Sequence, residues 1–164
     1  MVREKLDKNS GMMTKVWGPA GWVFLHASVM GYPVKIDEDD RIHRKRKRKT
    51  KQFFESIGYI FPCKYCRESY QQFIKELPID DFLSTRKKLA RWLYRIHNKV
   101  NKKLGVPKCD IPTFQEVYDR YEEYRAVCSQ TTAAERSRRI EKGCVVPKNG
   151  RKKRCLIKIV DVKK

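Results

Sequence analysis

The stretch that decides the fold is STRKKLARWLYRIHNKVNKKLG, residues 84–105. Its apolar residues recur every three or four positions, which is the period of one helix face. They are Leu89, Leu93, Ile96, Val100 and Leu104. Ser84 supplies a candidate N-cap, and Gly105 with Pro107 ends the segment. The pattern predicts one long helix with an apolar stripe.

The same period appears on both sides of this segment. Helices are expected at residues 16–29, 52–61, 63–77 and 113–125. Pro62 divides the second from the third, because its ring and missing N–H disrupt a helix interior. The last helix carries an aromatic stripe, which is typical of a core face. Residues 16–128 therefore predict an all-α fold, a compact helical bundle with little sign of strands.

The tail follows a different pattern. Asn149-Gly150 lies between β-prone residues in GCVVPKNGRKKRCLIKIVDV, residues 143–162, which is a strong hairpin signal. A two-residue turn centred there places Cys144 directly opposite Cys155, within the Cα separation that a disulfide accepts. The basic tail is thus expected to form a β-hairpin.

Charge is the most unusual feature of the composition. The 164 residues include 39 Lys and Arg against 19 Asp and Glu, a formal charge of +20, which attracts nucleic acid, anionic membranes and acidic proteins. Residues 41–51, RIHRKRKRKTK, hold eight of these cations, and residues 136–154 are also dense in them. The run is either a nuclear signal or nucleic-acid patch, or a solvated basic loop. The loop is favoured, because no aromatic residue interleaves the run as a stacking platform.

The sequence gives no support for a membrane protein or a secreted protein. No run approaches eighteen apolar residues, so no membrane span is expected. The N-terminus MVREKLDKNSGMM lacks the apolar region of a secretory signal. Six cysteines permit three disulfides, although a reducing cytosol would oppose them.

Cys63 and Cys66 form a CxxC pair directly after Pro62. A zinc site usually needs a second close pair, whereas Cys109 and Cys128 are isolated, so no metal site is expected. A thioredoxin-like motif would follow a strand, whereas the preceding segment is predicted helical. The remaining interpretation is a redox-active pair at a helix amino end, where partial positive charge stabilises a thiolate. Lys64 and Arg67 add positive charge nearby.

Three motifs in order carry a resemblance to a known family: WGPAGWVFLH at 17–26, CKYC at 63–66 and WLYRIHNKVNKKLG at 92–105. Together they resemble the Erv/ALR family of FAD-dependent sulfhydryl oxidases, in the form found in large DNA viruses. The resemblance implies a four-helix bundle with a short fifth helix that binds FAD, usually as a homodimer. It implies a tail at 1–13, the oxidase domain at 14–130 and a basic extension at 131–164.

The resemblance also implies an activity. Protein dithiols would exchange onto the Cys63–Cys66 disulfide through a mixed disulfide at Cys63. The reduced pair would pass electrons from Cys66 to FAD and then to O2, giving hydrogen peroxide. By the same resemblance the compartment is host cytoplasm or virion for a viral protein, with the mitochondrial intermembrane space as the alternative. A second hypothesis is a non-enzymatic, disulfide-stapled basic module that binds nucleic acid or acidic partners.

The family's cofactor contacts carry over by position. They are Trp17, Gly18, Trp22, His26, His97, Asn98 and Asn101, with Lys102, Lys103 and Arg125 as candidates for the pyrophosphate. Independently, His97 and Asn101 are four residues apart and share a helix face. Taken alone, Trp22 or His26 would be interpreted as a core residue.

The other cysteines are assigned by the same resemblance. Cys109 and Cys128 resemble the family's structural disulfide. Family members often carry a mobile second pair, and Cys144 with Cys155 is the remaining candidate, since no cysteine precedes Cys63. That pair is either a tail staple, the favoured interpretation, or a shuttle. Pro19 and Gly21 depart from the family motif and are expected to shape the helix start.

Overall fold

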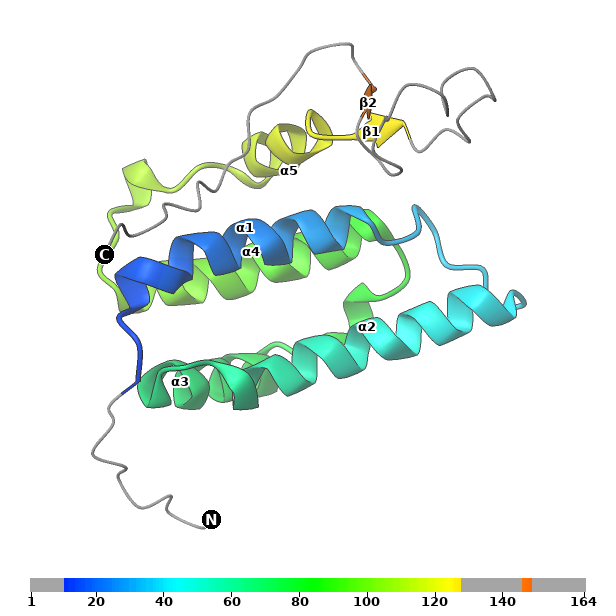
Figure 1. The fold of residues 1–164 in the computed structure, drawn as a ribbon. Helices are drawn as coiled ribbons and strands as arrows, with labels where there is room; N and C mark the ends of the chain where they lie inside the picture. Colours follow the sequence, from blue (N-terminus) through cyan, green and yellow to red (C-terminus); the bar gives the residue numbers. More distant parts are fainter. Residues whose placement is uncertain (1–10, 128–145, 149–164) are drawn as a thin grey trace, which may run out of the picture. The chain divides into compact units, whose positions relative to one another are not determined.

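A computed structural model describes residues 11–127 and 146–148 (Figure 1). The chain divides into two compact units, Met1–Phe114 and Gln115–Lys164. The first unit contains the helices α1 (Thr14–Met30), α2 (Arg41–Ile60), α3 (Lys64–Glu76) and α4 (Arg86–Lys103), with 3-10 turns η1 (Asp80–Phe82) and η2 (Lys108–Asp110). Helix α5 (Phe114–Glu122) begins at the boundary, and strands β1 (Ala126–Val127) and β2 (Val146–Pro147) belong to the second unit.

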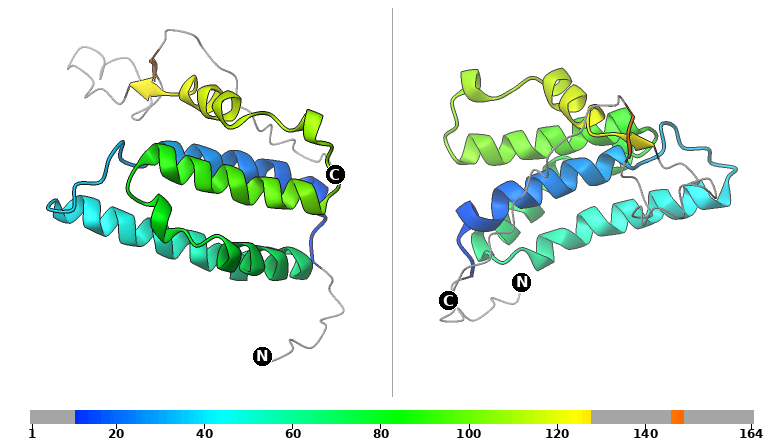
Figure 2. Two further views of the ribbon diagram at one scale, coloured as in Figure 1. Left: turned by 180° about the vertical axis from the view of Figure 1, so that it is seen from behind. Right: turned by 45° about the horizontal axis from the view of Figure 1, so that its top comes forward.

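The four long helices form a bundle of two layers. Helix α1 lies beside α4 in one layer, and α2 lies beside α3 in the other (Figures 1 and 2). The N-terminal ends of α1 and α3 meet the C-terminal ends of α2 and α4 at one end of this bundle (Figure 1). The predicted all-α architecture is confirmed.

The core lies between the two layers and is built largely on α4. Leu89, Leu93 and Ile96 are fully buried, as the apolar stripe predicts, and Trp92, which the stripe did not include, is fully buried as well. The stripe does not stay buried to its end, because Val100 is only partly buried and Leu104 is 71% exposed. The last turn of α4 therefore leaves the core and faces the end of the bundle.

Helix boundaries differ from the predicted ones by a few residues. The cap of α4 is Thr85 rather than Ser84, since the Lys88 N–H donates to Thr85 Oγ1 at 3.1 Å. The backbone carbonyl of Ser84 instead accepts from the Ile36 N–H at 2.9 Å. Helix α1 begins at Thr14 and contains Pro19 in its second turn, so this proline does not mark the helix start.

Residues 41–51 are helical, so their interpretation as a basic loop is wrong. Asp40 caps α2, and its Oδ1 accepts from the Ile42 N–H at 2.6 Å and the His43 N–H at 3.3 Å. Lys and Arg are good helix formers, and the run continues directly into the core-packed half of the same helix, where Phe54 is buried. Because the run has no apolar periodicity, the sequence pattern did not predict that it is helical.

The second unit adds a short antiparallel pairing. Strand β1 pairs with β2, with Ala126 opposite Pro147 and Val127 opposite Val146. The turn proposed at 149–150, together with Cys144 and Cys155, lies outside the described residues, so the tail hairpin and its register stay a prediction. No helix in the described part of the chain is long and apolar enough to cross a membrane.

We expect Gly58→Ala to destabilise the bundle. A Cβ at Gly58 would lie 2.8 Å from Tyr70 Cδ1, and the Tyr70 ring is held by the bond from its hydroxyl to Phe54 O at 2.8 Å. Overpacking costs about 1–3 kcal/mol, against which the better helix propensity of alanine returns up to about 1 kcal/mol. Urea unfolding at pH 7 measures the net loss.

Gly18→Ala is the matched control. A Cβ there meets nothing within 4 Å, so this helical substitution is expected to be neutral or stabilising by up to about 1 kcal/mol. Equal stability of the two variants would contradict close packing of α2 on α3 at Gly58.

Candidate functional site

The CxxC pair lies where α3 begins. Cys63 is the N-cap of α3, and its Sγ accepts a hydrogen bond from the Cys66 N–H at 3.3 Å. The Cys63 carbonyl also accepts from the N–H groups of Cys66 and Arg67, at 3.1 and 3.0 Å. Both cysteines are partly buried, and neither forms a disulfide with another described residue. The predicted helix amino end at the CxxC motif is confirmed.

The electrostatics of Cys66 differ from the sequence-based expectation of a stabilised thiolate. Burial, together with the hydrogen bond and charge of Cys63, raises its pKa to about 11. The charges of Lys103 and Arg67 act in the opposite direction. Desolvation therefore outweighs the positive charges of Lys103 and Arg67 at Cys66 when both thiols are reduced.

A ring cluster joins α1 to α4. The Trp22 and His97 rings stack face to face, with centroids 3.8 Å apart and planes at 10°. His26 is buried one helical turn after Trp22, and its Nε2 lies 3.2 Å from His97 Nδ1. One of these nitrogens must carry the proton that the other accepts, so the pair fits two neutral rings in complementary tautomers.

Burial keeps both imidazoles uncharged. Desolvation, with a smaller contribution from the nearby His97, lowers the pKa of His26 to about 4. Desolvation lowers the pKa of His97 to about 4 as well. Near neutral pH the ring cluster is therefore an uncharged aromatic surface, although the chain as a whole is strongly basic.

The two helices that carry the ring cluster also contact the segment that carries the thiols. On α1, the Trp17 ring packs against Phe61 with centroids 5.4 Å apart, two residues before Cys63. On α4, Lys103 donates to the Ser69 hydroxyl of α3, and its charge acts on Cys66. Helices α1 and α4 thus each carry a member of the ring cluster and a contact beside the CxxC motif.

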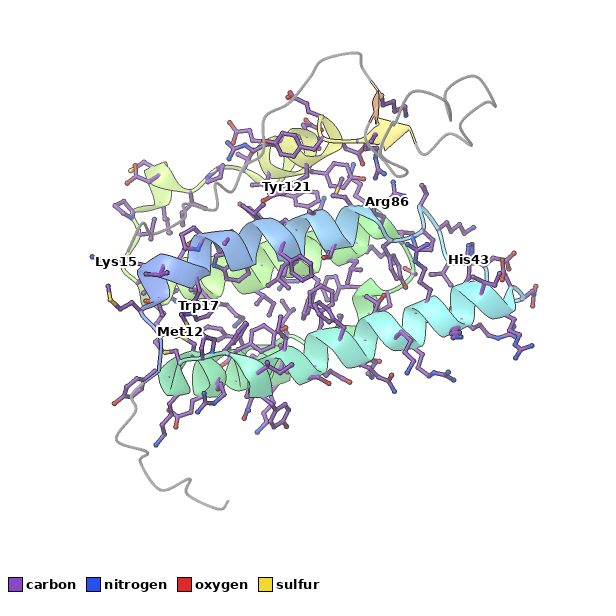
Figure 3. The ribbon with its side chains drawn as sticks, in the orientation of Figure 1. Met12, Lys15, Trp17, His43, Arg86 and Tyr121 are labelled. Carbon is purple, nitrogen blue, oxygen red and sulfur yellow. The ribbon has the colours of Figure 1, made fainter. Side chains whose placement is uncertain are left out.

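The segment before α1 closes onto the CxxC turn. The Met12 N–H donates to Pro62 O at 2.9 Å, and the Met12 carbonyl accepts from Trp17 Nε1 at 3.3 Å. Figure 3 shows Met12 and Trp17 together at this end of the bundle. Gly11 has a φ of 84°, and a Cβ there would lie 2.1 Å from Pro62 O, so glycine permits the close approach.

The polar end of α4 carries the other predicted cofactor contacts. The Asn101 side-chain amide donates to Asn98 Oδ1 at 3.1 Å, and Lys102 is exposed. These residues, with His97 and Lys103, occupy the two turns where α4 leaves the core. On α1, Trp17 lies at the end that contacts the CxxC turn and Gly18 follows it, whereas Trp22 and His26 lie farther along the helix, where they join His97 of α4.

The remaining predicted residues belong to other elements. Arg125 follows α5 in the second unit, where its guanidinium forms an ion pair with Glu122 at 2.5 Å that raises its pKa. Cys109 is exposed in η2. Its predicted partner Cys128 lies outside the described residues, and the Cys109–Cys128 disulfide stays a prediction.

Sequence reasoning missed three contributors to the site. Phe61 and Ser69 contact Trp17 and Lys103, and Met12 binds the CxxC turn. Phe61 could have been identified as a contributor because it is an aromatic residue directly before Pro62. No sequence pattern identifies Met12 as one. Within the described ranges, no three His, Cys, Asp or Glu side chains gather as metal ligands would.

Comparison with known proteins matches residues 19–121 to the Erv1 / Alr family. A probable FAD-linked sulfhydryl oxidase of Acanthamoeba polyphaga mimivirus is 34% identical over 110 residues, which are 66% of this chain and 73% of the relative. The mitochondrial FAD-linked sulfhydryl oxidase ERV1 of Saccharomyces cerevisiae is 33% identical over 93 residues, 57% of this chain and 45% of the relative. The chain thus spans under half of the yeast protein's length.

The fold comparison gives the same result. The crystal structure of the FAD binding domain of Erv1 from Saccharomyces cerevisiae superposes with a TM-score of 0.58 at 28% identity, covering 68% of this chain and 95% of that one. The yeast Erv1 core superposes with a TM-score of 0.57 at 28% identity, covering 74% of this chain and 95% of that one.

We expect the stability of the protein to fall as the pH drops from about 6.5 to 4. The pKa of His26 is about 4 in the folded state and about 6.5 in the unfolded state. Between these two pH values the unfolded state binds a proton at His26 and the folded state does not, so protonation favours unfolding. By pH 5 the loss from His26 is about 2 kcal/mol. Urea unfolding across pH 7.5 to 4.5 measures it.

His26→Phe tests the assignment. It keeps a ring of similar size but cannot take up a proton, so the slope of unfolding free energy against pH should flatten, leaving the contribution of His97. A variant with the wild-type slope would show that another group titrates.

Proposed function

Because the chain belongs to the Erv1 / Alr family, we propose that it is an FAD-linked sulfhydryl oxidase that converts protein dithiols into disulfides. The observation that carries the proposal is that α1 and α4, which hold the Trp22–His97 stack, also contact the segment around Cys63 and Cys66 through Trp17 and Lys103. Neither motif is decisive alone. An uncharged aromatic surface on two helices that also contact the dithiol segment suits electron transfer from that dithiol to a planar cofactor.

The side chains of these two helices fit the chemistry of FAD. Trp22 and the neutral His97 offer ring faces for stacking on a planar system. Asn98 and Asn101 offer amide donors and acceptors for polar ring edges, and Lys102 and Lys103 offer charge for a pyrophosphate. When bound, FAD supplies the two-electron acceptor that links the dithiol to O2, with hydrogen peroxide as the product.

The protein's own cysteines perform the exchange. A client thiolate attacks Cys63 Sγ of the oxidised pair, forming a mixed disulfide and releasing Cys66 as a thiolate. The second client thiol, once deprotonated, attacks the client sulfur of this mixed disulfide. The client leaves as a disulfide, and Cys63 and Cys66 are left reduced by two electrons.

Fixed charges and donors assist each leaving sulfur. Lys103 and Arg67 lower the cost of negative charge on Cys66 when Cys63 is attacked. The Cys66 N–H, 3.3 Å from Cys63 Sγ, stabilises negative charge on Cys63 when the client disulfide departs. Arg67 is itself held by the bond from its Nη1 to Phe61 O at 2.7 Å, which fixes it beside the pair.

The same proposal covers the partners and the compartment of the protein. Protein dithiols are the electron donors, O2 the acceptor, and a homodimer the working assembly. The compartment is host cytoplasm or virion, as for the viral relatives, with the mitochondrial intermembrane space as the alternative. The hypothesis of a non-enzymatic module finds no support, since the relatives are named as oxidases. Cys144 and Cys155 remain assigned to a staple or a shuttle.

Flavin content and oxygen uptake test the function. The purified full-length protein should absorb as a flavoprotein and consume O2 when given a small dithiol. Cys63→Ser and Cys66→Ser should each lower turnover by at least about 100-fold, because exchange requires both sulfurs. The double variant should be no worse than the worse single one, as expected of residues that act as a unit.

Bound flavin serves as the control in the same samples. Both serine variants should keep their flavin absorbance, so that lost turnover reports on the thiols and not on cofactor loss. Wild-type turnover in either variant, or a wild-type protein that binds no flavin, would overturn the proposal.

We also expect dimerisation to depend on an exposed aromatic pair. Phe24 of α1 is 59% exposed and Phe53 of α2 is 39% exposed, and their rings meet edge to face at 6.3 Å. A second copy would bury this surface in a homodimer. Phe24→Glu with Phe53→Glu should halve the mass measured by light scattering, and an unchanged dimer would place the interface elsewhere. Tyr59→Glu, at an exposed ring farther along α2, is the control.

A further inference from the structure

The first half of α2 presents a line of cations that the thiol site does not use. Arg41, Lys45, Arg48 and Lys49 lie four, three and one residues apart, which places them on one side of the helix. All four side chains are exposed. In Figure 3, nitrogen-tipped side chains project outward from this part of α2, around the labelled His43. We call these four residues the basic stripe.

Other cations near this surface already have partners. Lys47 pairs with Glu38 and Lys51 with Asp80, while Arg46 donates to Gly31 O at 2.5 Å. Arg44 donates to the carbonyls of Glu38 and Asp39. The basic stripe differs, because its side chains make no ion pair or hydrogen bond within the described part of the chain.

The stripe places like charges on neighbouring turns. Arg41 with Lys45 and Lys45 with Lys49 are four residues apart, a spacing at which equal charges repel across a helix face. The fold holds them there through the Asp40 cap and the buried Phe54 and Gly58 farther along the helix. A bound polyanion would remove this repulsion.

We propose that the basic stripe binds the phosphate backbone of double-stranded nucleic acid without reading its sequence. Nucleic-acid interfaces are much more positively charged than protein interfaces, whose centres are depleted in charge. From Arg41 to Lys49 the helix spans about 12 Å, against one duplex charge per about 1.7 Å, so each of the four cations can meet a phosphate.

Two other polyanions fit this surface less well. Single strands are usually held by aromatic stacking platforms, and the stripe contains no aromatic residue. Membrane-surface helices insert an apolar face, whereas the apolar side of α2 faces the core through Phe54 and Gly58. A regular phosphate lattice remains the best match to four cations in a line.

Binding at the stripe would leave the thiol site open. About 18 Å of helix separates Arg48 from Ile60, the last residue of α2 before the CxxC turn. The surface would therefore tether the protein to a duplex while Cys63 stays accessible. This separation also allows nucleic-acid binding by the stripe to be tested independently of thiol oxidation.

Salt-dependent binding to a 20-base-pair duplex of mixed sequence tests the proposal. Fluorescence anisotropy from 50 to 200 mM salt would compare the full-length wild type with a variant carrying Arg41→Gln, Lys45→Gln, Arg48→Gln and Lys49→Gln. Loss of four phosphate contacts should lower the slope of log K against log salt by about 3.6. Over this range the wild type should lose roughly 150-fold more affinity than the variant.

A second quadruple variant with the same change in net charge is the control. It replaces four ion-paired lysines by glutamine: Lys47, Lys51, Lys64 and Lys99. It should keep most of the wild-type slope, and the stripe variant should keep wild-type oxygen uptake with a small dithiol. Equal slopes for the two variants, no duplex binding by the wild type, or tighter binding to single strands or anionic vesicles would each overturn the proposal.

Discussion

The burial of Trp92 is the constraint on which the rest of the structure depends. Its side chain is 0% exposed, its indole N–H donates to Leu77 O at 2.9 Å, and its ring meets Phe54 edge to face at 5.1 Å. One residue of α4 thus contacts both α2 and the end of α3, so that the two layers share one centre. With its single polar atom paired, the indole contributes area to the core without an unsatisfied donor.

This packing fixes the two ends of α4 differently. The apolar face of its first three turns is buried, whereas Val100 is partly buried and Leu104 is exposed. The turns that leave the core carry Asn98, Asn101 and Lys103, and the charge of Lys103 acts on Cys66. A helix that is buried along its whole length could not present polar side chains at its end. The site therefore depends on the burial of the apolar stripe of α4 ending before the helix does.

Charged and uncharged side chains occupy different parts of the first unit, which the composition of the chain does not reveal. His26 and His97 are kept neutral by burial, and the thiol end receives positive charge only from specific neighbours such as Lys103. Much of the remaining charge lies on the solvent side of α2. A chain with a net charge of +20 thereby keeps an uncharged aromatic cluster on the two helices that contact its dithiol segment.

The sequence by itself determined the helices and the family, because periodic apolar residues and the ordered CxxC and HNxVN motifs are local patterns. It placed the N-terminus of α3 at Cys63 but failed at residues 41–51, where helix formation relies on the Asp40 cap and on continuity with a packed segment. Only the tertiary structure decided that Trp22 stacks on His97, since 75 positions separate them and no local rule joins their rings. It also decided the raised pKa of Cys66, because desolvation depends on neighbours that the chain brings together only when it folds.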